Sequence, residues 1–256
     1  MNYSNKFIEI VESSIKKGIN YIGKGNPNAK ILIIGKELAL AQNNSVAIEK
    51  TSEQNALDWK KNIENPNNKI EDCLGDYPET INLFNPLVPY KGMGFNPRKP
   101  SETWRKYQFL YDKIFNIESK TYNFHKEIFI TELNANPSKY SNLQKKDKRS
   151  ASINERKNNF FNSDFIQNFP IVLVACGHYP KNNNVDLCEL FKVEFKETIH
   201  VKDNPKYWYN LHINKEGEEP KLLIHTVQLS GSITNEFLEE IANTIKLFAF
   251  KNNIEL

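Results

Sequence analysis

Short apolar runs alternate with amphipathic segments along most of this chain. Four runs are almost continuously apolar, and polar or turn-forming residues bound each of them: Lys30–Gly35, Glu127–Leu133, Ile171–Cys176 and Lys221–His225. A run of this kind is typical of a strand that is buried on both faces, as in a parallel sheet. The pattern therefore predicts four buried strands.

Segments with helical spacing of apolar residues precede, separate and follow these runs. They are Phe7–Lys17, Trp104–Phe115, Ile153–Phe165 and Thr234–Phe250. Strands that alternate with helices indicate right-handed βαβ crossovers, because a parallel neighbour can be reached only through a crossover. We therefore expect an α/β fold, a three-layer α/β/α sandwich around a central, mainly parallel four-stranded sheet.

The remaining segments change this picture little. Phe191–His212 is less regular and predicts an extra hairpin or an edge strand. No internal repeat and no linker divides the chain, so we expect one domain over residues 1–256, with an N-terminal helix within residues 1–25 packed on it.

Composition narrows the class of protein. The 256 residues are 39% hydrophobic and 25% charged, which excludes a disordered, collagen-like or coiled-coil chain. Three cysteines form no CxxC pair, and the five histidines have no metal-ligand spacing, so we expect no disulfide framework, metal or iron–sulfur cofactor. Without a signal-peptide pattern or a long apolar run, the expected location is the cytoplasm, with no membrane partner.

Polar residues gather where the four predicted strands end. In open α/β sheets, ligands bind beyond the carboxyl ends of the strands, so candidate chemistry is sought there. The residues at these exits are Glu37, Glu132, Asn134, His178, His225 and Ser230.

Two of these exits resemble motifs of the uracil-DNA glycosylase superfamily. Gly35-Lys-Glu-Leu-Ala39 stands where that superfamily has Gly-Gln-Asp-Pro-Tyr or Gly-Glu-Ala-Pro-Gly, and His225-Thr-Val-Gln-Leu-Ser230 is similar to His-Pro-Ser-Pro-Leu-Ser. A third segment, Ile130-Thr-Glu-Leu133, resembles Ile-Thr-Asn-Leu. The chain departs from the family at both prolines of the histidine motif, which are Thr226 and Gln228, and it lacks the aspartate and proline of the first loop.

The resemblance implies hydrolysis of an N-glycosidic bond. That reaction builds positive charge on the sugar and negative charge on the departing base, so a carboxylate and a hydrogen-bond donor stabilise it. By position, Glu37 is the expected carboxylate and His225 the expected donor. The alternatives are that Glu37 is a solvated loop residue or a helix cap, and that His225 is a satisfied histidine at a strand end.

The same resemblance places base-contacting residues. Glu132 stands where the family has a base-reading asparagine, with Asn134 two residues on, and Tyr90 and Phe95 are expected to stack on a flipped base. A carboxylate only accepts hydrogen bonds, so Glu132 favours an exocyclic amine, as on cytosine, over a uracil carbonyl. The alternative is that Glu132 faces a structural arginine or solvent.

Basic residues cluster although the net charge is only +3. Residues 139–157 hold seven basic and two acidic side chains, and a second cluster mixes basic residues with Trp104. Such clusters are typical of a DNA-binding surface, and a solvated charged loop is the alternative. The predicted DNA contacts are Arg98, Lys99, Arg105, Lys145, Lys146, Lys148, Arg149 and, at a loop that enters the duplex, Ser230 and the wedge Ile233.

Taken together, the sequence predicts a monomeric, metal-free DNA glycosylase that excises an unidentified base, in repair or in phage defence. A catalytically inactive relative that binds DNA or a nucleotide is one alternative. A nucleoside or nucleotide hydrolase, which would not need the basic clusters, is another.

Overall fold

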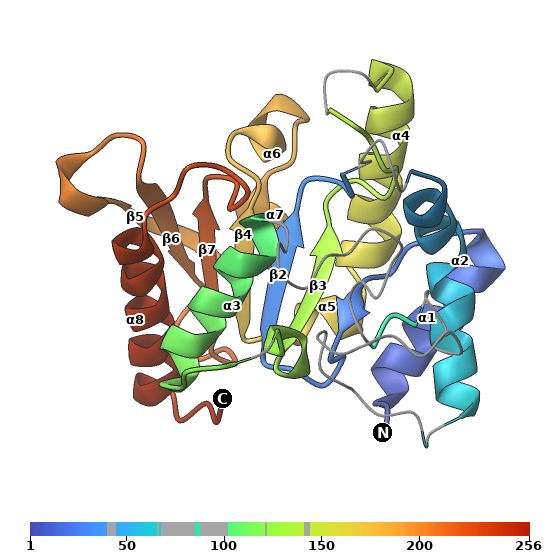
Figure 1. The fold of residues 1–256 in the computed structure, drawn as a ribbon, viewed down its shortest axis with the longest axis horizontal. Helices are drawn as coiled ribbons and strands as arrows, with labels where there is room; N and C mark the ends of the chain where they lie inside the picture. The colour runs from blue at the N-terminus through green and yellow to red at the C-terminus, as the bar shows by residue number, and fades with distance from the viewer. Residues whose placement is uncertain (40–44, 66, 68–84, 88–101, 121, 141–143) are drawn as a thin grey trace.

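Seven strands form one mixed sheet through the middle of the molecule (Figure 1). The computed structural model describes residues 1–39, 45–65, 67, 85–87, 102–120, 122–140 and 144–256. The strand order is β1-β3-β2-β4-β7-β6-β5. The strands are β1 (Lys24–Gly25), β2 (Ile31–Gly35), β3 (Ile128–Glu132), β4 (Ile171–Ala175), β5 (Glu194–His200), β6 (Trp208–Ile213) and β7 (Leu222–Thr226).

The four predicted strands are present, but the expected sheet was wrong. β3, β2, β4 and β7 are adjacent and parallel, whereas β1 pairs antiparallel with β3, and β6 and β5 extend the other side antiparallel. The sheet is therefore seven-stranded and mixed instead of four-stranded and mainly parallel, and only the α/β class is confirmed. The predicted hairpin within Phe191–His212 is formed by β5 and β6.

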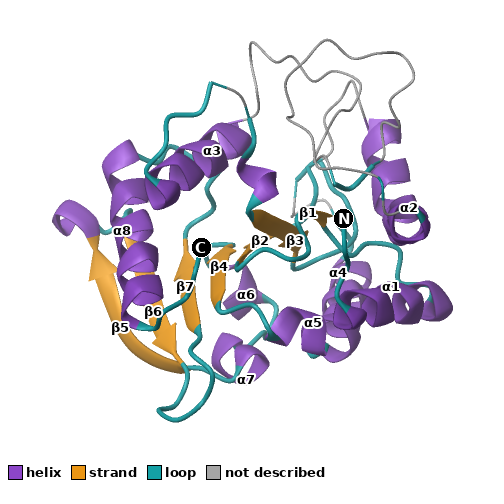
Figure 2. Cartoon of the chain, turned by 90° about the horizontal axis from the view of Figure 1, so that it is seen from below, coloured by secondary structure: helices purple, strands orange, loops and turns teal. Residues whose placement is uncertain are grey.

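Helices cover both faces of the sheet (Figure 2). Buried side chains alternate between the faces along each central strand: Leu32 and Ile34 pack on one side, Ile31 and Ile33 on the other. The helices are α1 (Asn5–Lys17), α2 (Ser45–Glu64), α3 (Glu102–Phe115), α4 (Lys146–Glu155), the π-helical η3 (Arg156–Phe161), α5 (Asp164–Gln167), α6 (Tyr179–Asn182), α7 (Leu187–Phe191) and α8 (Asn235–Lys251). The short 3₁₀ turns are η1 (Phe124–Lys126) and η4 (Val201–Asp203).

Local sequence signals set the ends of the long helices. The Ser4 side chain accepts a hydrogen bond from the Phe7 N–H at the start of α1, and Gly18 ends that helix at a φ of 69°. The Thr234 side chain likewise accepts from the Phe237 N–H at the start of α8. Among the described helices, none is long and apolar enough to cross a membrane.

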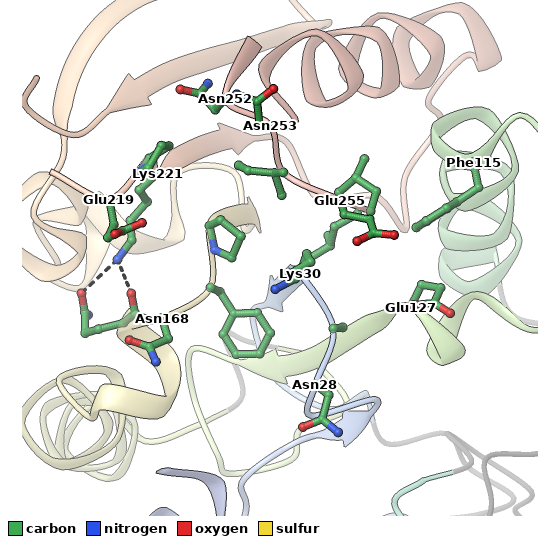
Figure 3. Close-up of a pocket in the computed structure, with 18 residues that line it drawn as sticks. Asn28, Lys30, Phe115, Glu127, Asn168, Glu219, Lys221, Asn252, Asn253 and Glu255 are labelled. Carbon is green, nitrogen blue, oxygen red and sulfur yellow. Dashed lines mark hydrogen bonds between the residues drawn. The ribbon is translucent and has the colours of Figure 1, made fainter. Parts of the chain in front are cut away.

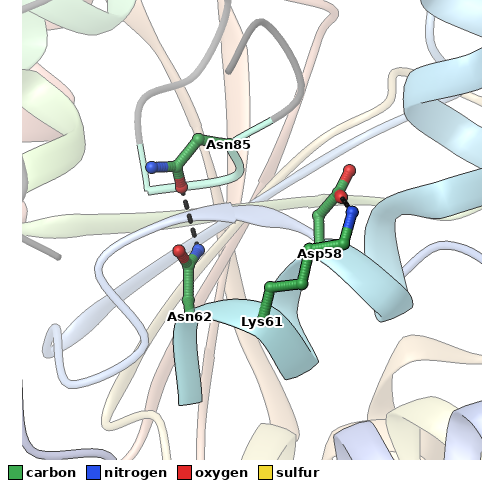
Figure 4. A network of polar contacts seen from close by, with 4 residues as sticks. All are labelled: Asp58, Lys61, Asn62 and Asn85. Carbon is green, nitrogen blue, oxygen red and sulfur yellow. Dashed lines mark hydrogen bonds and ion pairs between the residues drawn. The ribbon is translucent and has the colours of Figure 1, made fainter. Parts of the chain in front are cut away.

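Helix α2 also anchors a short segment through buried polar side chains (Figure 4). The Asn62 side chain donates to the Asn85 side chain at 2.9 Å, while Lys61 and Asp58 form an ion pair one turn away at 2.7 Å. The Asn62–Asn85 bond holds residues 85–87 against α2, and Leu87 is buried in the core.

Candidate functional site

The loops that follow β2 and β3 run side by side past the carboxyl edge of the sheet. The N–H groups of Leu133, Asn134 and Ser138 donate to the carbonyls of Gly35, Lys36 and Leu38 at 2.8–2.9 Å. The chain passes from β2 to β3 on one side and returns to β4 on the other, so the sheet's switch point lies between β2 and β4. This backbone pairing fixes Glu37 at the switch point.

A buried hydroxyl holds the Glu37 side chain. Tyr179, which begins α6 after β4, donates its hydroxyl to Glu37 and accepts from Asn134 Nδ2 at 3.3 Å. Burial, and then the charge of Glu37, raise the pKa of Tyr179. Tyr179 therefore stays protonated and serves as a fixed donor to Glu37. Lys36 Nζ lies 5.9 Å from the centre of the Tyr179 ring and adds a positive charge beside this pair.

The side-chain amide of Asn134 makes all its hydrogen bonds to other groups of the protein. The residue is fully buried, and its Nδ2 also donates to Gln144 Oε1 at 2.7 Å. Its Oδ1 accepts from the Asn136 N–H at 3.0 Å. Both amide hydrogens are thus engaged, and Asn134 organises the loop and Tyr179 instead of being positioned to read a base.

Glu132 ends β3 and lies over the backbone of β2. It is the register partner of Gly35, and a Cβ at Gly35 would overlap the Glu132 carboxyl group. Burial first, and Glu37 second, raise the pKa of Glu132 from 4.5 to about 8. At neutral pH the group is a neutral acid that can donate a hydrogen bond, so the expected preference for an exocyclic amine does not follow.

His225 makes a hydrogen bond that limits its expected role. Its Nε2 lies 2.7 Å from the Gly177 carbonyl oxygen. A carbonyl only accepts, so Nε2 carries the proton and donates it there. Burial lowers the pKa of His225, which keeps the ring neutral with a lone pair on Nδ1. The predicted donor to a leaving base is therefore occupied, and the alternative of a satisfied strand-end histidine describes the geometry.

The predicted basic surface is formed in part by α4, which rises at the carboxyl edge (Figure 1). Lys145, Lys146 and Lys148 are exposed at its start. Arg149 is half-buried, and its Nε donates to Asn183 Oδ1 at 3.1 Å, which ties α4 to the segment after α6. Arg105, on α3, is exposed and paired with Glu102 at 2.6 Å.

Other predicted contacts fall elsewhere. Ser230 is exposed, but Ile233 is buried in the core against α8, and its carbonyl accepts from Lys106 Nζ at 2.6 Å. The wedge predicted at Ile233 is therefore not presented at the surface, because its side chain is packed in the protein. Four predicted residues lie outside the described part of the chain: Tyr90, Phe95, Arg98 and Lys99.

Sequence reasoning placed His178 at a strand exit but missed two aromatic residues beside it, Tyr179 and Trp208. Tyr179 and His178 belong to the exit of β4, and Trp208 begins β6. The exit Cys176-Gly-His-Tyr-Pro180 was visible as a polar turn, but nothing in it indicated the bond from Tyr179 to Glu37. Trp208 lies in the aromatic triplet Tyr207-Trp-Tyr209, the one local signal for its place.

A separate cavity of about 820 Å³ opens at the opposite edge of the sheet, where the strands begin (Figure 3). Lys30, Lys221 and Glu127 line it, and Lys221 Nζ donates to the Gln167 carbonyl at 2.6 Å. Burial lowers the pKa of Lys221 to about 8. Both lysines and glutamates line this cavity, and it shares no residue with the carboxyl-edge site.

Within the described residues, no group of three or more histidine, cysteine, aspartate or glutamate side chains could hold a metal ion. No family model matches this chain, and no curated protein matches it either.

Proposed function

We propose that this protein is a DNA glycosylase of the kind that the two strand-exit motifs resemble, acting as a monomer in the cytoplasm. One observation carries the proposal. The Glu37 carboxyl group stands at the switch point of the sheet, where the Tyr179 hydroxyl holds it and basic α4 flanks it. A fixed carboxylate beside a basic surface suits a reaction that builds positive charge on a sugar of a polyanion.

The two carboxyl groups at this edge, Glu37 and Glu132, supply a base and an acid. Glu37 orients a water molecule and takes its proton as the water oxygen bonds to the anomeric carbon. The bond from that carbon to the base nitrogen breaks, and its electron pair leaves with the base. Glu132, kept protonated by burial and by Glu37, donates a proton to the departing base. The donor role that the motif implies for His225 thus passes to Glu132.

Base release from defined DNA substrates tests this proposal. DNA carrying uracil, mismatched thymine or modified cytosines is incubated with the protein and assayed for alkali-labile abasic sites. We expect cleavage of one substrate by the wild type, and a loss of about 100-fold or more in Glu37→Gln. Glu219→Gln, an exposed glutamate at the opposite edge, is the matched control. Unchanged cleavage in Glu37→Gln and Glu132→Gln would refute the assignment.

The geometry of His225 favours a second candidate, a DNA- or nucleotide-binding protein that has lost catalysis. Because its Nε2 proton is given to Gly177, the motif histidine has no donor left for a base in this conformation. This candidate predicts salt-sensitive DNA binding by the wild type with no base release from any substrate. Base release that depends on Glu37 would exclude it.

A further inference from the structure

Three rings from three different elements pack together at the carboxyl edge. His178, at the exit of β4, stacks on Trp208 with ring centroids 5.5 Å apart and planes inclined by 18°. Trp208 meets His225 of β7 edge to face at 5.3 Å and 83°. The backbone under Trp208 is fixed, because the Thr226 hydroxyl donates to the Trp208 carbonyl at 2.7 Å. The cluster is therefore built into the sheet.

The stacked pair faces solvent. His178 is exposed and Trp208 is half-buried, so the outer side of the imidazole is a flat, accessible surface. Exposed lysines lie close to both residues in the sequence: Lys181, on α6, follows His178 by three residues, and Lys206 precedes Trp208 by two. An aromatic face with cations around it is the arrangement that binds a nucleic acid base and its phosphates.

This surface continues the proposed catalytic site. His178 is joined directly to Tyr179, whose hydroxyl is bonded to Glu37. On the other side, Arg149 connects α4 to Asn183, just beyond α6. The carboxyl edge therefore presents basic side chains at α4, the carboxyl pair in the middle, and the stacked rings beside the β5–β6 hairpin.

We propose that His178 and Trp208 form a stacking subsite for an unpaired base of single-stranded DNA, next to the nucleotide at Glu37. This inference rests on the proposed function, since it needs DNA at the carboxyl edge. Stacking requires an unpaired base, because the faces of paired bases in a duplex are covered by their neighbours. The subsite accepts any base, since every base has an aromatic face.

Two probes separate stacking from charge: a short oligothymidylate, and an oligonucleotide of equal length made of abasic sites. We expect His178→Ala and Trp208→Ala each to lose about tenfold in affinity for oligothymidylate, the size of one stacking contact, and to bind the abasic strand as the wild type does. Phe195→Ala, an exposed aromatic at the other end of the same hairpin, is the matched control and should bind both strands normally. His178 is exposed, so its variant keeps the test informative if Trp208→Ala unfolds.

The outcomes separate this inference from the proposed function. Equal affinity of the wild type for oligothymidylate and the abasic strand would overturn the stacking subsite. Unchanged oligothymidylate affinity in His178→Ala and Trp208→Ala would overturn it as well, and neither result bears on Glu37-dependent base release. Selective loss of oligothymidylate binding without any base release would support the subsite and refute the glycosylase. A wild type that binds neither strand would refute the subsite, and base release is then measured independently.

Discussion

Replacing Glu132 by glutamine should remove a pH-dependent loss of stability. The pKa of the half-buried Glu132 carboxyl is raised from 4.5 to about 8 by loss of solvent and by Glu37. The unfolded chain releases this proton near the ordinary value, whereas the folded chain holds it to about pH 8. The stability that the protonated group contributes is therefore complete at acidic pH and is lost as the pH rises through this window.

The size of the loss follows from the two pKa values. A rise from 4.5 to about 8 corresponds to about 5 kcal/mol in the free energy of unfolding once the pH exceeds both values. That is a large part of the total stability of a typical domain, about 5–15 kcal/mol. Glutamine keeps the shape and the hydrogen-bonding oxygen but does not titrate. Relative to the wild type, the free energy of unfolding of Glu132→Gln should therefore rise by up to about 5 kcal/mol from acidic to alkaline pH.

Urea unfolding measures this difference. Wild type, Glu132→Gln and the control Glu219→Gln are unfolded at about pH 5, 7 and 9 and constant ionic strength, with far-ultraviolet circular dichroism as the signal. Comparison at each pH cancels the other titrating groups that the proteins share, apart from their coupling to Glu132. A difference between Glu132→Gln and wild type that is the same at every pH would refute the reasoning, because Glu132 would then ionise alike in the folded and unfolded chains.

Three further predictions test the site. Tyr179→Phe removes the hydroxyl that bonds both Glu37 and Asn134, so the rate of base release should fall about tenfold or more, while the free energy of unfolding falls by the worth of two hydrogen bonds, about 1–3 kcal/mol; an unchanged rate would contradict the positioning role. Gly35→Ala places a methyl group in the space of the Glu132 carboxyl and should cost about 1–3 kcal/mol in urea unfolding. The double variant with Glu132→Ala should recover part of that loss, whereas fully additive costs would rule out the overlap. Replacing the three exposed lysines at the start of α4, Lys145, Lys146 and Lys148, by alanine should weaken the salt dependence of DNA binding. The slope of log affinity against log salt concentration should become shallower by about 2–3, and an unchanged slope would place the phosphate contacts elsewhere.

The buried strands were predictable because burial on both faces leaves a continuous apolar run in the sequence. Ile31–Gly35 and Ile171–Ala175 are buried at every position, and both were expected within one residue of their ends. β5 shows the opposite case: it is exposed at nearly every position and thus has no apolar pattern. β1 is two residues long and too short to carry one. For this reason β1 was missed, and the β5–β6 edge was expected only as a less regular hairpin or edge strand outside the four-stranded sheet.

The gathering of strand-exit side chains at one edge was predictable, but their hydrogen bonds and protonation states were not. Strand exits placed Glu37, Glu132 and His225 at one edge, because carboxyl ends of parallel strands meet there. The proton on His225, the protonated state of Glu132 and the engaged amide of Asn134 depend on neighbours far away in the sequence. Gly177 is 48 residues from His225, and Tyr179 is 45 residues from Asn134.

The hairpin of β5 and β6 connects the unexpected antiparallel edge of the sheet with the unexpected environment of His225. By pairing with β7 it sets Trp208 edge-on against His225, on a ring whose Nε2 already binds Gly177. A histidine enclosed in this way is suited to supporting an aromatic surface, and less suited to donating a proton to a base. In the proposed glycosylase, the acid must then come from another group at the same edge. We propose Glu132 for this role, because its carboxyl lies over Gly35, and burial and Glu37 raise its pKa to about 8. The same antiparallel extension that overturns the predicted sheet thus explains why the histidine motif departs from its expected role.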